Sequence, residues 1–287
     1  MPTHPKPLDI GGRLLGGHGR ALICTPLVGR TTAALKAELT AIVPQGPDLV
    51  EWRVDFFDAI ANRREVLSAA AELRALAGGV PIIFTRRAAH EGGEPIAIDE
   101  DAVVALYGAL CASGDIDVVD YELSQPEHHR RTVRAVSQAH GVALIVSCHD
   151  FHATPGSAEM VATLLRAERE GADIAKLAVM PCAPGDVLRL LDATLQAGAA
   201  LRIPLIAIAM GALGAMTRIC GWQYGSSVTF AVGQRVSAPG QIPTKELRRA
   251  MAALGEQQAN RVRPLLHGQL RKRRRNSPPA RWPSRAS

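Results

Sequence analysis

Short apolar runs alternate with longer amphipathic stretches along most of the chain. Eight runs rich in β-branched residues begin 24 to 36 residues apart, at residues 21–28, 48–57, 80–87, 116–123, 142–150, 173–179, 203–210 and 227–232. The stretches between them repeat apolar residues at the spacing of a helix with one buried face. Eight strand–helix units over about 250 residues are what a closed (β/α)8 TIM barrel requires. An open doubly wound sheet is the alternative, but it usually has a glycine-rich phosphate turn after its first strand, and TPLVGRTT is not such a turn.

This pattern divides the chain into three segments. Residues 1–20 contain LDIGGRLLGG, which predicts a short hairpin that plugs the bottom of the barrel. Residues 21–260 form the predicted catalytic barrel. Residues 261–287 hold nine Lys and Arg, no Asp or Glu, and several Pro and Ser, a composition typical of a disordered tail. Removing these nine charges from the net +6 leaves −3 over residues 1–260, so the basicity belongs to the tail and nucleic acid is not an expected partner.

Charged residues share one face of the predicted strands. In VEWRVD, Glu51, Arg53 and Asp55 alternate with apolar residues. The same alternation places further polar residues on that face of later strands: Thr85, Arg87, Asp120, Glu122, Ser147 and His149. The helices around a barrel require apolar partners, so the charged face must line the lumen. A salt-bridge network would explain one pair of buried charges, whereas charges from five strands favour a functional site.

The stretch LIVSCHDFHATP, residues 144–155, could be a metal site, a thiol nucleophile with its base, or a strand with one working histidine. Cys148 and His149 are consecutive, so in a strand they point to opposite faces and cannot share a metal or form a thiol–base pair. His152 lies past the end of the strand. His149 is therefore the candidate for the chemistry, with Asp150 and His152 as its candidate neighbours.

Lys176 lies within the apolar strand IAKLAV. A lysine there loses hydration, which favours the neutral amine that Schiff-base chemistry needs. The alternative is a lysine neutralised by a carboxylate such as Glu122. His149 ends the preceding strand, and adjacent strands lie about 5 Å apart, so both side chains can reach one substrate. A lysine that holds a carbonyl and a histidine that moves protons together favour imine formation followed by abstraction of an α-proton.

Three arginines lie at or just beyond the carboxyl ends of strands: Arg53, Arg87 and Arg218. Such a set suggests a carboxylate or phosphate ligand together with internal ion pairs. No glycine-rich phosphate cradle accompanies them, so we expect a carboxylate.

Composition narrows the class of protein. The chain is 47% hydrophobic, which is ample for a core, and no apolar run reaches the ~18 residues of a membrane span. The N-terminus lacks the apolar segment and cleavage site of a signal peptide. The five cysteines form no CxxC pair, which fits reduced cytoplasmic thiols better than disulfides or a zinc site. We therefore expect a cytoplasmic protein without a membrane partner.

From about Leu8 to Leu254 the chain resembles the type I 3-dehydroquinate dehydratases. The resemblance is carried by EWRVD, FTRRAAHEGG, SCHDFHATP, GADIAKLAVMP, TRICGWQYGSSVTF and SAPGQIP. That family is a (β/α)8 barrel that uses no metal or cofactor and removes water from 3-dehydroquinate to give 3-dehydroshikimate. The resemblance implies a cytoplasmic lyase of the shikimate pathway and aromatic amino acid biosynthesis, working through a Schiff base as a homodimer.

The resemblance also implies a role for each site residue. Lys176 would form the imine with the ring ketone of the substrate. His149 would take the adjacent C2 proton, help the C1 hydroxyl leave as water, and assist formation and hydrolysis of the imine. Glu91 would orient and tune His149. Arg218 would hold the substrate carboxylate. The remaining expected substrate-binding residues are Glu51, Arg53, Arg87, Met210, Phe230, Ser237 and Gln241, the last two in a lid loop.

Two residues depart from the family pattern, and two other functions are alternatives. Ile208 stands where relatives often have a second methionine, and His90 where lysine is common. A class I aldolase-type barrel shares the strand lysine but usually needs a phosphate site after its last strands, where SAPGQIP favours a lid. A non-catalytic barrel with a nucleic-acid-binding tail would lack a site residue, and Lys176, His149 and Glu91 are all present.

Overall fold

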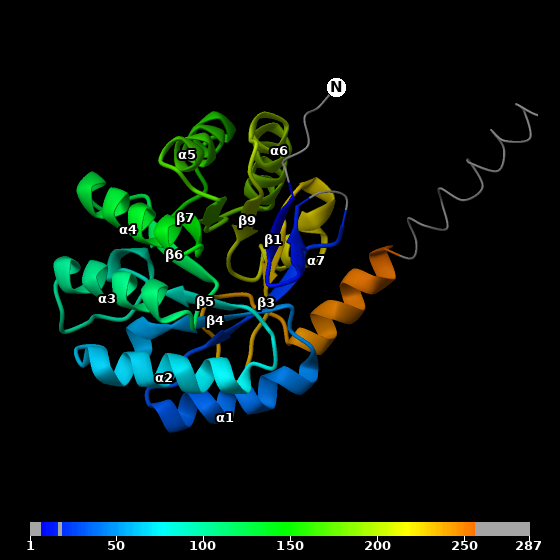
Figure 1. Cartoon of the computed structure of the whole chain (residues 1–287). Coiled ribbons are helices and arrows are strands. Elements are labelled where there is room, and N and C mark those ends of the chain that lie inside the picture. Colours follow the sequence, from blue (N-terminus) through cyan, green and yellow to red (C-terminus); the bar gives the residue numbers. More distant parts are fainter. Residues whose placement is uncertain (1–6, 17–18, 256–287) are drawn as a thin grey trace, which may run out of the picture.

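Eight parallel strands form a nearly closed barrel in the computed structural model, which describes residues 7–16 and 19–255 (Figure 1). The strands are β3 (Leu22–Leu27), β4 (Leu49–Arg53), β5 (Ile82–Thr85), β6 (Val118–Glu122), β7 (Ala143–Asp150), β8 (Ile174–Val179), β9 (Leu205–Ala209) and β10 (Val228–Phe230). They follow chain order around the sheet, from β3 to β9, with β10 beside β3. A parallel bridge between Leu205 and Ser226 brings the two ends of the sheet together. The predicted TIM barrel is confirmed.

Helices surround this sheet. They are α1 (Thr32–Ile42), α2 (Arg63–Leu76), α3 (Glu100–Ser113), α4 (Glu127–Ala139), α5 (Ser157–Arg169), α6 (Pro184–Ala200), the short α7 (Ala215–Cys220) and a helix from residue 244 to at least 255. Thr31, Asn62 and Asp99 accept backbone N–H bonds at the first turns of α1, α2 and α3, which is why these helices begin there. Short 3-10 turns complete the connections: η1 (Val43–Gln45), η2 (Val54–Phe56), η3 (Ala89–Glu91) and η4 (Gly221–Tyr224).

Each predicted apolar run contains a strand, but most strands are shorter than their run. The largest difference is in residues 48–57, where β4 ends at Arg53 and the chain turns into η2. The turn has a physical cause, because it brings the carboxylate of Asp55 back to the guanidinium of Arg53, with both N–O distances below 3 Å.

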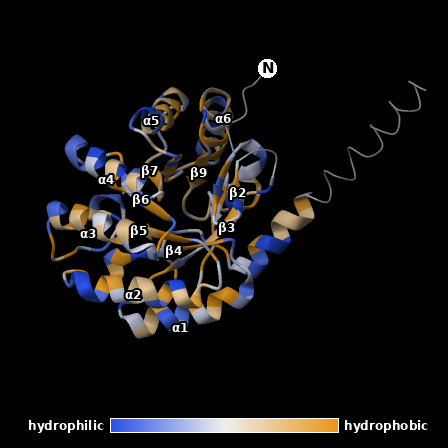
Figure 2. Ribbon diagram, in the orientation of Figure 1, coloured by the Kyte–Doolittle hydropathy of each residue, from blue (hydrophilic) through white to orange (hydrophobic). Residues whose placement is uncertain are grey.

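The strands separate two apolar layers. The outer layer lies between strands and helices and includes Val50, Trp52 and Val54, the apolar face predicted for VEWRVD. The inner layer fills the lower lumen with side chains from the starts of strands, such as Leu49 and Ile174. Figure 2 shows hydrophobic colour along the strands and a mixture of both colours on the helices around them.

A hairpin closes the lower end of the barrel. Strands β1 (Leu8–Ile10) and β2 (Arg13–Leu15) pair antiparallel across a Gly11–Gly12 turn, and both glycines have the positive φ that such a tight turn requires. Ile10 and Leu15 are buried within the inner apolar layer. The predicted plug is thereby confirmed.

The predicted basic tail, residues 261–287, lies outside the described residues. Among the helices that the structure describes, none is long and apolar enough to cross a membrane.

Replacing Trp52 with alanine tests the outer layer. The indole is fully buried and meets the rings of Phe57 and Phe84 edge-on, with centroids 5.6 and 5.5 Å away. The resulting cavity should lower the free energy of unfolding by about 3–5 kcal/mol, measured by urea denaturation. Leu188→Ala, at a side chain that is 68% exposed, is the control and should change it by no more than about 0.5 kcal/mol. A Trp52→Ala loss as small as that of the control would contradict this account of the core.

Candidate active site

A cavity opens at the carboxyl ends of the strands, the end at which TIM barrels carry their active sites. All eleven residues singled out from the sequence line it: Glu51, Arg53, Arg87, Glu91, His149, Lys176, Met210, Arg218, Phe230, Ser237 and Gln241. Further lining comes from Gly92, Phe151, Ala178, Ile208 and Ala238. Residues up to 190 positions apart in the chain thus meet around one space.

Lys176 lies in the middle of β8, and its side chain is 5% exposed. Its Nζ donates to Asp120 Oδ2 at 2.7 Å, lies 3.6 Å from Glu51 Oε1, and sits 4.5 Å above the centre of the Phe230 ring. Two carboxylates and an aromatic face all stabilise positive charge at this nitrogen. Any cationic group that replaces the ammonium here meets the same stabilising surroundings.

A carboxylate does pair with Lys176, but it is Asp120 and not Glu122, the example that the sequence suggested. Strand register does put Glu122 level with Ser147 and Lys176. The Glu122 side chain, however, is held by the Arg87 guanidinium at 3.0 Å and by the Ala88 N–H at 2.8 Å. Lys176 therefore donates to Asp120, which lies two residues before Glu122 in β6.

Arg87 and Asp120 form the centre of a buried network. Arg87 donates to Asp120 at 2.9 Å and to Ser147 at 2.8 Å, and Ser147 in turn donates to Asp120 at 2.6 Å. Burial opposes ionisation of Asp120, but Arg87 and Lys176 beside it lower its pKa overall. Asp120 is therefore a carboxylate throughout the neutral range.

Glu91 and His149 form a pair at the rim of this network. Glu91 Oε2 lies 2.9 Å from both the backbone nitrogen and the Nδ1 of His149. A carboxylate in this place keeps the proton on Nδ1 and leaves the lone pair of Nε2 available as a base. Burial raises the pKa of Glu91 to about 7, although hydrogen bonds from Ser124 and His149 and the charge of Arg87 oppose this rise. Burial, Arg87 and Lys176 lower the pKa of His149 well below its ordinary value.

Two glycines place Glu91 there. Gly92 has φ 82°, and a Cβ on it would lie 2.2 Å from the ring of Phe151. A Cβ on Gly93 would lie 1.9 Å from the carbonyl oxygen of Arg87. The HEGG sequence is thus needed for the close approach of η3 to the end of β7.

Arg218 is a buried cation that lacks a carboxylate partner among the residues that the structure describes. Its two terminal nitrogens donate to the carbonyl oxygens of Phe230 and Pro239, and its Nε has no partner within the described chain. Burial lowers its pKa to about 10, so it keeps its charge at neutral pH. Because a buried unpaired charge is costly, an anionic ligand in the cavity would stabilise this side chain.

The other two arginines are already paired within the protein. Arg53 makes a two-pronged contact with Asp55, and Arg87 is bonded to Asp120 and Glu122. Of these three arginines, Arg218 is therefore the one whose charge is not paired with a carboxylate of the described residues.

Ser237 and Gln241 bond to each other in the loop after β10. The Gln241 amide oxygen accepts from the Ser237 N–H at 3.0 Å, and its nitrogen donates to the Ser237 hydroxyl at 3.0 Å. Gly240 between them lies against the backbone of Gly211, with room for no side chain. The loop is thereby anchored over the cavity mouth.

Sequence reasoning did not single out Asp120, Ser147 or Ser124 as parts of the site. A signal for the first two existed, since alternation had already put them on the lumen face. Ser124 had none, because it follows the end of β6 and meets Glu91 only through the path of η3.

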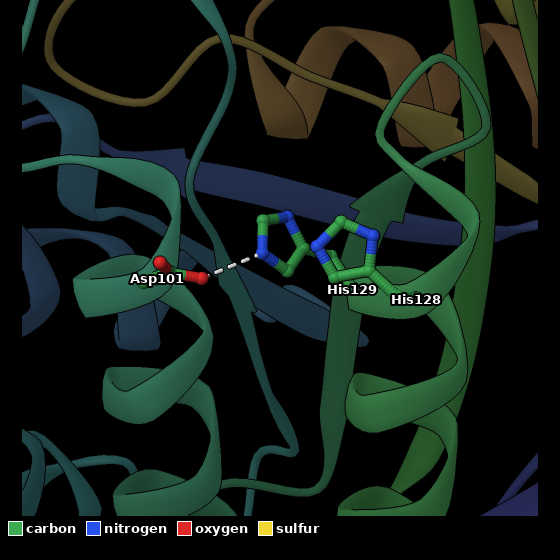
Figure 3. A group of neighbouring side chains, drawn as sticks. All are labelled: Asp101, His128 and His129. Atoms are coloured by element: carbon green, nitrogen blue, oxygen red, sulfur yellow. Dashed lines mark hydrogen bonds and ion pairs between the residues drawn. The ribbon is translucent and has the colours of Figure 1, made fainter.

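A second group of ionisable side chains lies outside the barrel, where Asp101 of α3 faces His128 and His129 of α4 (Figure 3). His129 Nε2 lies 2.8 Å from Asp101 Oδ1. All three residues belong to the first turns of their helices, whose positive ends disfavour a bound cation. None of them lines the cavity, and the hydrogen-bonded contact between Asp101 and His129 accounts for their arrangement.

The family model described as type I 3-dehydroquinase matches residues 23–258. The 3-dehydroquinate dehydratase of Aromatoleum aromaticum is 50% identical over 250 residues, which cover 87% of this chain and 96% of that protein. That of Albidiferax ferrireducens is 47% identical over 249 residues, covering 87% and 94%. The crystal structure of 3-dehydroquinate dehydratase from Geobacillus kaustophilus superposes with a TM-score of 0.86 at 46% identity, covering 89% of this chain and 99% of that one.

The coupling between Glu91 and His149 can be measured without any substrate. With the pKa of Glu91 at about 7, the carboxyl group should be protonated below pH 7 and ionised above it. The ¹⁵N resonances of the His149 ring should therefore change with a midpoint near pH 7, which belongs to the pair rather than to one residue. Glu91→Gln should abolish this transition and leave the resonances of the exposed His140 unchanged. A His149 titration that survives Glu91→Gln would contradict the coupling.

Proposed function

The chain belongs to the type I 3-dehydroquinase family, and from that premise we propose that Lys176 and His149 carry out the dehydration of 3-dehydroquinate to 3-dehydroshikimate through an imine. The enzyme is a hydro-lyase. The observation that carries the proposal is the placement of the Lys176 amine and the His149 ring in one cavity, on neighbouring strands.

The first step joins Lys176 to the ring ketone. The amine, once deprotonated, adds to the carbonyl carbon, and the carbonyl oxygen leaves as water. The resulting iminium carries the same charge as the ammonium that it replaces. Asp120 and Glu51 therefore stabilise both, so the charged intermediate needs no rearrangement of the lumen.

His149 carries the two proton transfers that follow. Its Nε2 takes the proton from C2, and the electron pair moves into the iminium to give an enamine. The enamine then returns these electrons and expels the C1 hydroxyl, which takes the proton from His149 and leaves as water. A second water hydrolyses the imine and releases the product from Lys176, so the net loss is one water.

The remaining lining residues would bind and orient the ring. Arg218 would pair with the substrate carboxylate, which satisfies the cation that the protein leaves unpaired. Glu51, Arg53 and Arg87 would bind ring hydroxyls. Ser237 and Gln241 would close the loop over the substrate, and Met210 and Phe230 would form its apolar side.

Three broader features belong to the same proposal. A role in the shikimate pathway and aromatic amino acid biosynthesis follows from the family's reaction. A cytoplasmic location is supported by the five cysteines, all of which are free thiols in the structure. A homodimer is proposed on the family resemblance alone.

Borohydride added together with 3-dehydroquinate should reduce the imine and leave a covalent adduct on Lys176, located by peptide mass spectrometry. Lys176→Ala should form none. Lys36→Ala, at an exposed lysine paired with Glu72, is the matched control and should trap as much as the unmodified protein. An adduct of normal yield in Lys176→Ala would refute the imine at this residue.

Replacing His149 with alanine should separate binding from proton transfer. Loss of a general acid–base group is expected to lower turnover by about 10²–10⁴-fold. The borohydride adduct should still form, since Lys176 and its carboxylates remain. Near-normal turnover in His149→Ala would show that another group is the base.

A further inference from the structure

The two oxygens of the Glu91 carboxylate have different partners. Oε2 is bonded to His149, as described above. Oε1 accepts a hydrogen bond of 2.5 Å from the hydroxyl of Ser124, in the turn between β6 and α4. Both oxygens of the carboxylate are therefore hydrogen-bonded. Its orientation toward His149 depends on Ser124, which does not line the cavity.

The Ser124 hydroxyl has a second neighbour besides Glu91. His90 Nε2 lies 3.2 Å from the same hydroxyl oxygen, and the His90 side chain is 63% exposed. A serine hydroxyl has one proton to donate. If Glu91 is a carboxylate it can only accept, so the Ser124 proton points to Glu91 and His90 donates to the serine oxygen.

Charged groups from several elements act on Glu91 and on His149. Arg87 at the end of β5 favours the ionised carboxyl group, whereas Glu122 of β6 opposes it. On the far side, Arg87 and Lys176 disfavour a proton on His149, and Asp120 favours one. His90 Nε2 lies 3.9 Å from Glu91 Oε1. Burial opposes ionisation of Glu91 most strongly, so a direct donor to its oxygen has a large effect on its proton.

We propose that Ser124 is a positioning residue for the dehydration: its hydroxyl holds Glu91 ionised and keeps the second carboxylate oxygen turned toward His149. The inference rests on the proposed function in that His149 is the base. Ser124 does not line the cavity, and its side-chain contacts are with Glu91 and His90, so it acts through Glu91. Removing its hydroxyl leaves Oε1 without a donor in a buried place, and the carboxyl group then retains its proton to higher pH.

The test is the pH profile of kcat/KM, whose acid limb reports the free enzyme. In Ser124→Ala the acid limb should move up by about one pH unit, which corresponds to a tenfold loss of kcat/KM at pH 6. Above pH 9 the loss should be less than about threefold, because Glu91 is ionised there in both proteins. Ser124→Thr keeps a hydroxyl and should restore the profile.

Two further variants serve as controls. Ser113→Ala removes a hydroxyl that bonds only to backbone groups at the end of α3, and should leave the acid limb in place. His90→Ala removes the second contact of the Ser124 oxygen and should shift the limb by less than Ser124→Ala. A larger shift in His90→Ala would overturn the assignment to Ser124.

The NMR midpoint of His149 gives a readout that needs no turnover. It should rise in Ser124→Ala as the acid limb does. If the unmodified protein does not dehydrate 3-dehydroquinate, the proposed function fails while this midpoint still tests Ser124. If the unmodified protein does dehydrate 3-dehydroquinate, two results in Ser124→Ala would overturn the inference. One is an unchanged acid limb and midpoint, and the other is an equal loss of kcat/KM at all pH values.

Should Ser124→Ala not fold, Ser124→Cys takes its place. Its thiol is a weaker donor than the hydroxyl, so it should give a smaller shift in the same direction.

Discussion

The ion pair between Lys176 and Asp120 is the constraint from which the arrangement of this barrel follows. The nitrogen and the oxygen lie 2.7 Å apart in the lumen, with Asp120 fully buried and Lys176 only 5% exposed. Removing either charge alone would leave the other without compensation, at a cost of several kcal/mol. The pair therefore requires its surroundings to be charged and hydrogen-bonded as well. Arg87, Ser147 and Glu122 meet that requirement. Ser147 and Glu122 project from strands whose outer face is apolar, and Arg87 lies in the loop just after β5.

The same requirement explains why the cavity opens to one side. The lower lumen is filled by apolar side chains and closed by the β1–β2 hairpin, and the cavity beside the charged network opens at the carboxyl ends of the strands. Within that network nearly every charge has a partner of opposite sign. Arg218 is the exception among the described residues, and it stands at the cavity wall. The internal salt bridges and the binding site are thus parts of one arrangement rather than alternatives.

Regular spacing of the apolar runs predicted the fold, and alternation along single strands predicted the lumen face. Eight apolar runs at regular spacing predicted the barrel, and Glu51, Arg87 and His149 lie on the face that period-2 alternation indicated. Alternation could not predict which of two nearby lumen carboxylates pairs with Lys176. Lys176 pairs with Asp120 rather than Glu122 because the Glu122 carboxylate already accepts hydrogen bonds from the Ala88 N–H and the Arg87 guanidinium. That competition involves β6, β8 and the loop after β5, and no single stretch of sequence contains it.

Glu91 and His149 show how the packing of a loop reverses the ordinary order of two titrating groups. In water a glutamate loses its proton before a histidine does. Here burial raises the pKa of Glu91 to about 7 and, with Arg87 and Lys176, lowers that of His149 well below its ordinary value. Environments that separate two titrating groups in this way are typical of acid–base sites. Above pH 7 the histidine is neutral, with its Nδ1 proton directed to a carboxylate and its Nε2 unprotonated. This arrangement exists before any ligand enters the cavity, because the glycines after Glu91 let η3 approach β7 closely enough to bury the pair.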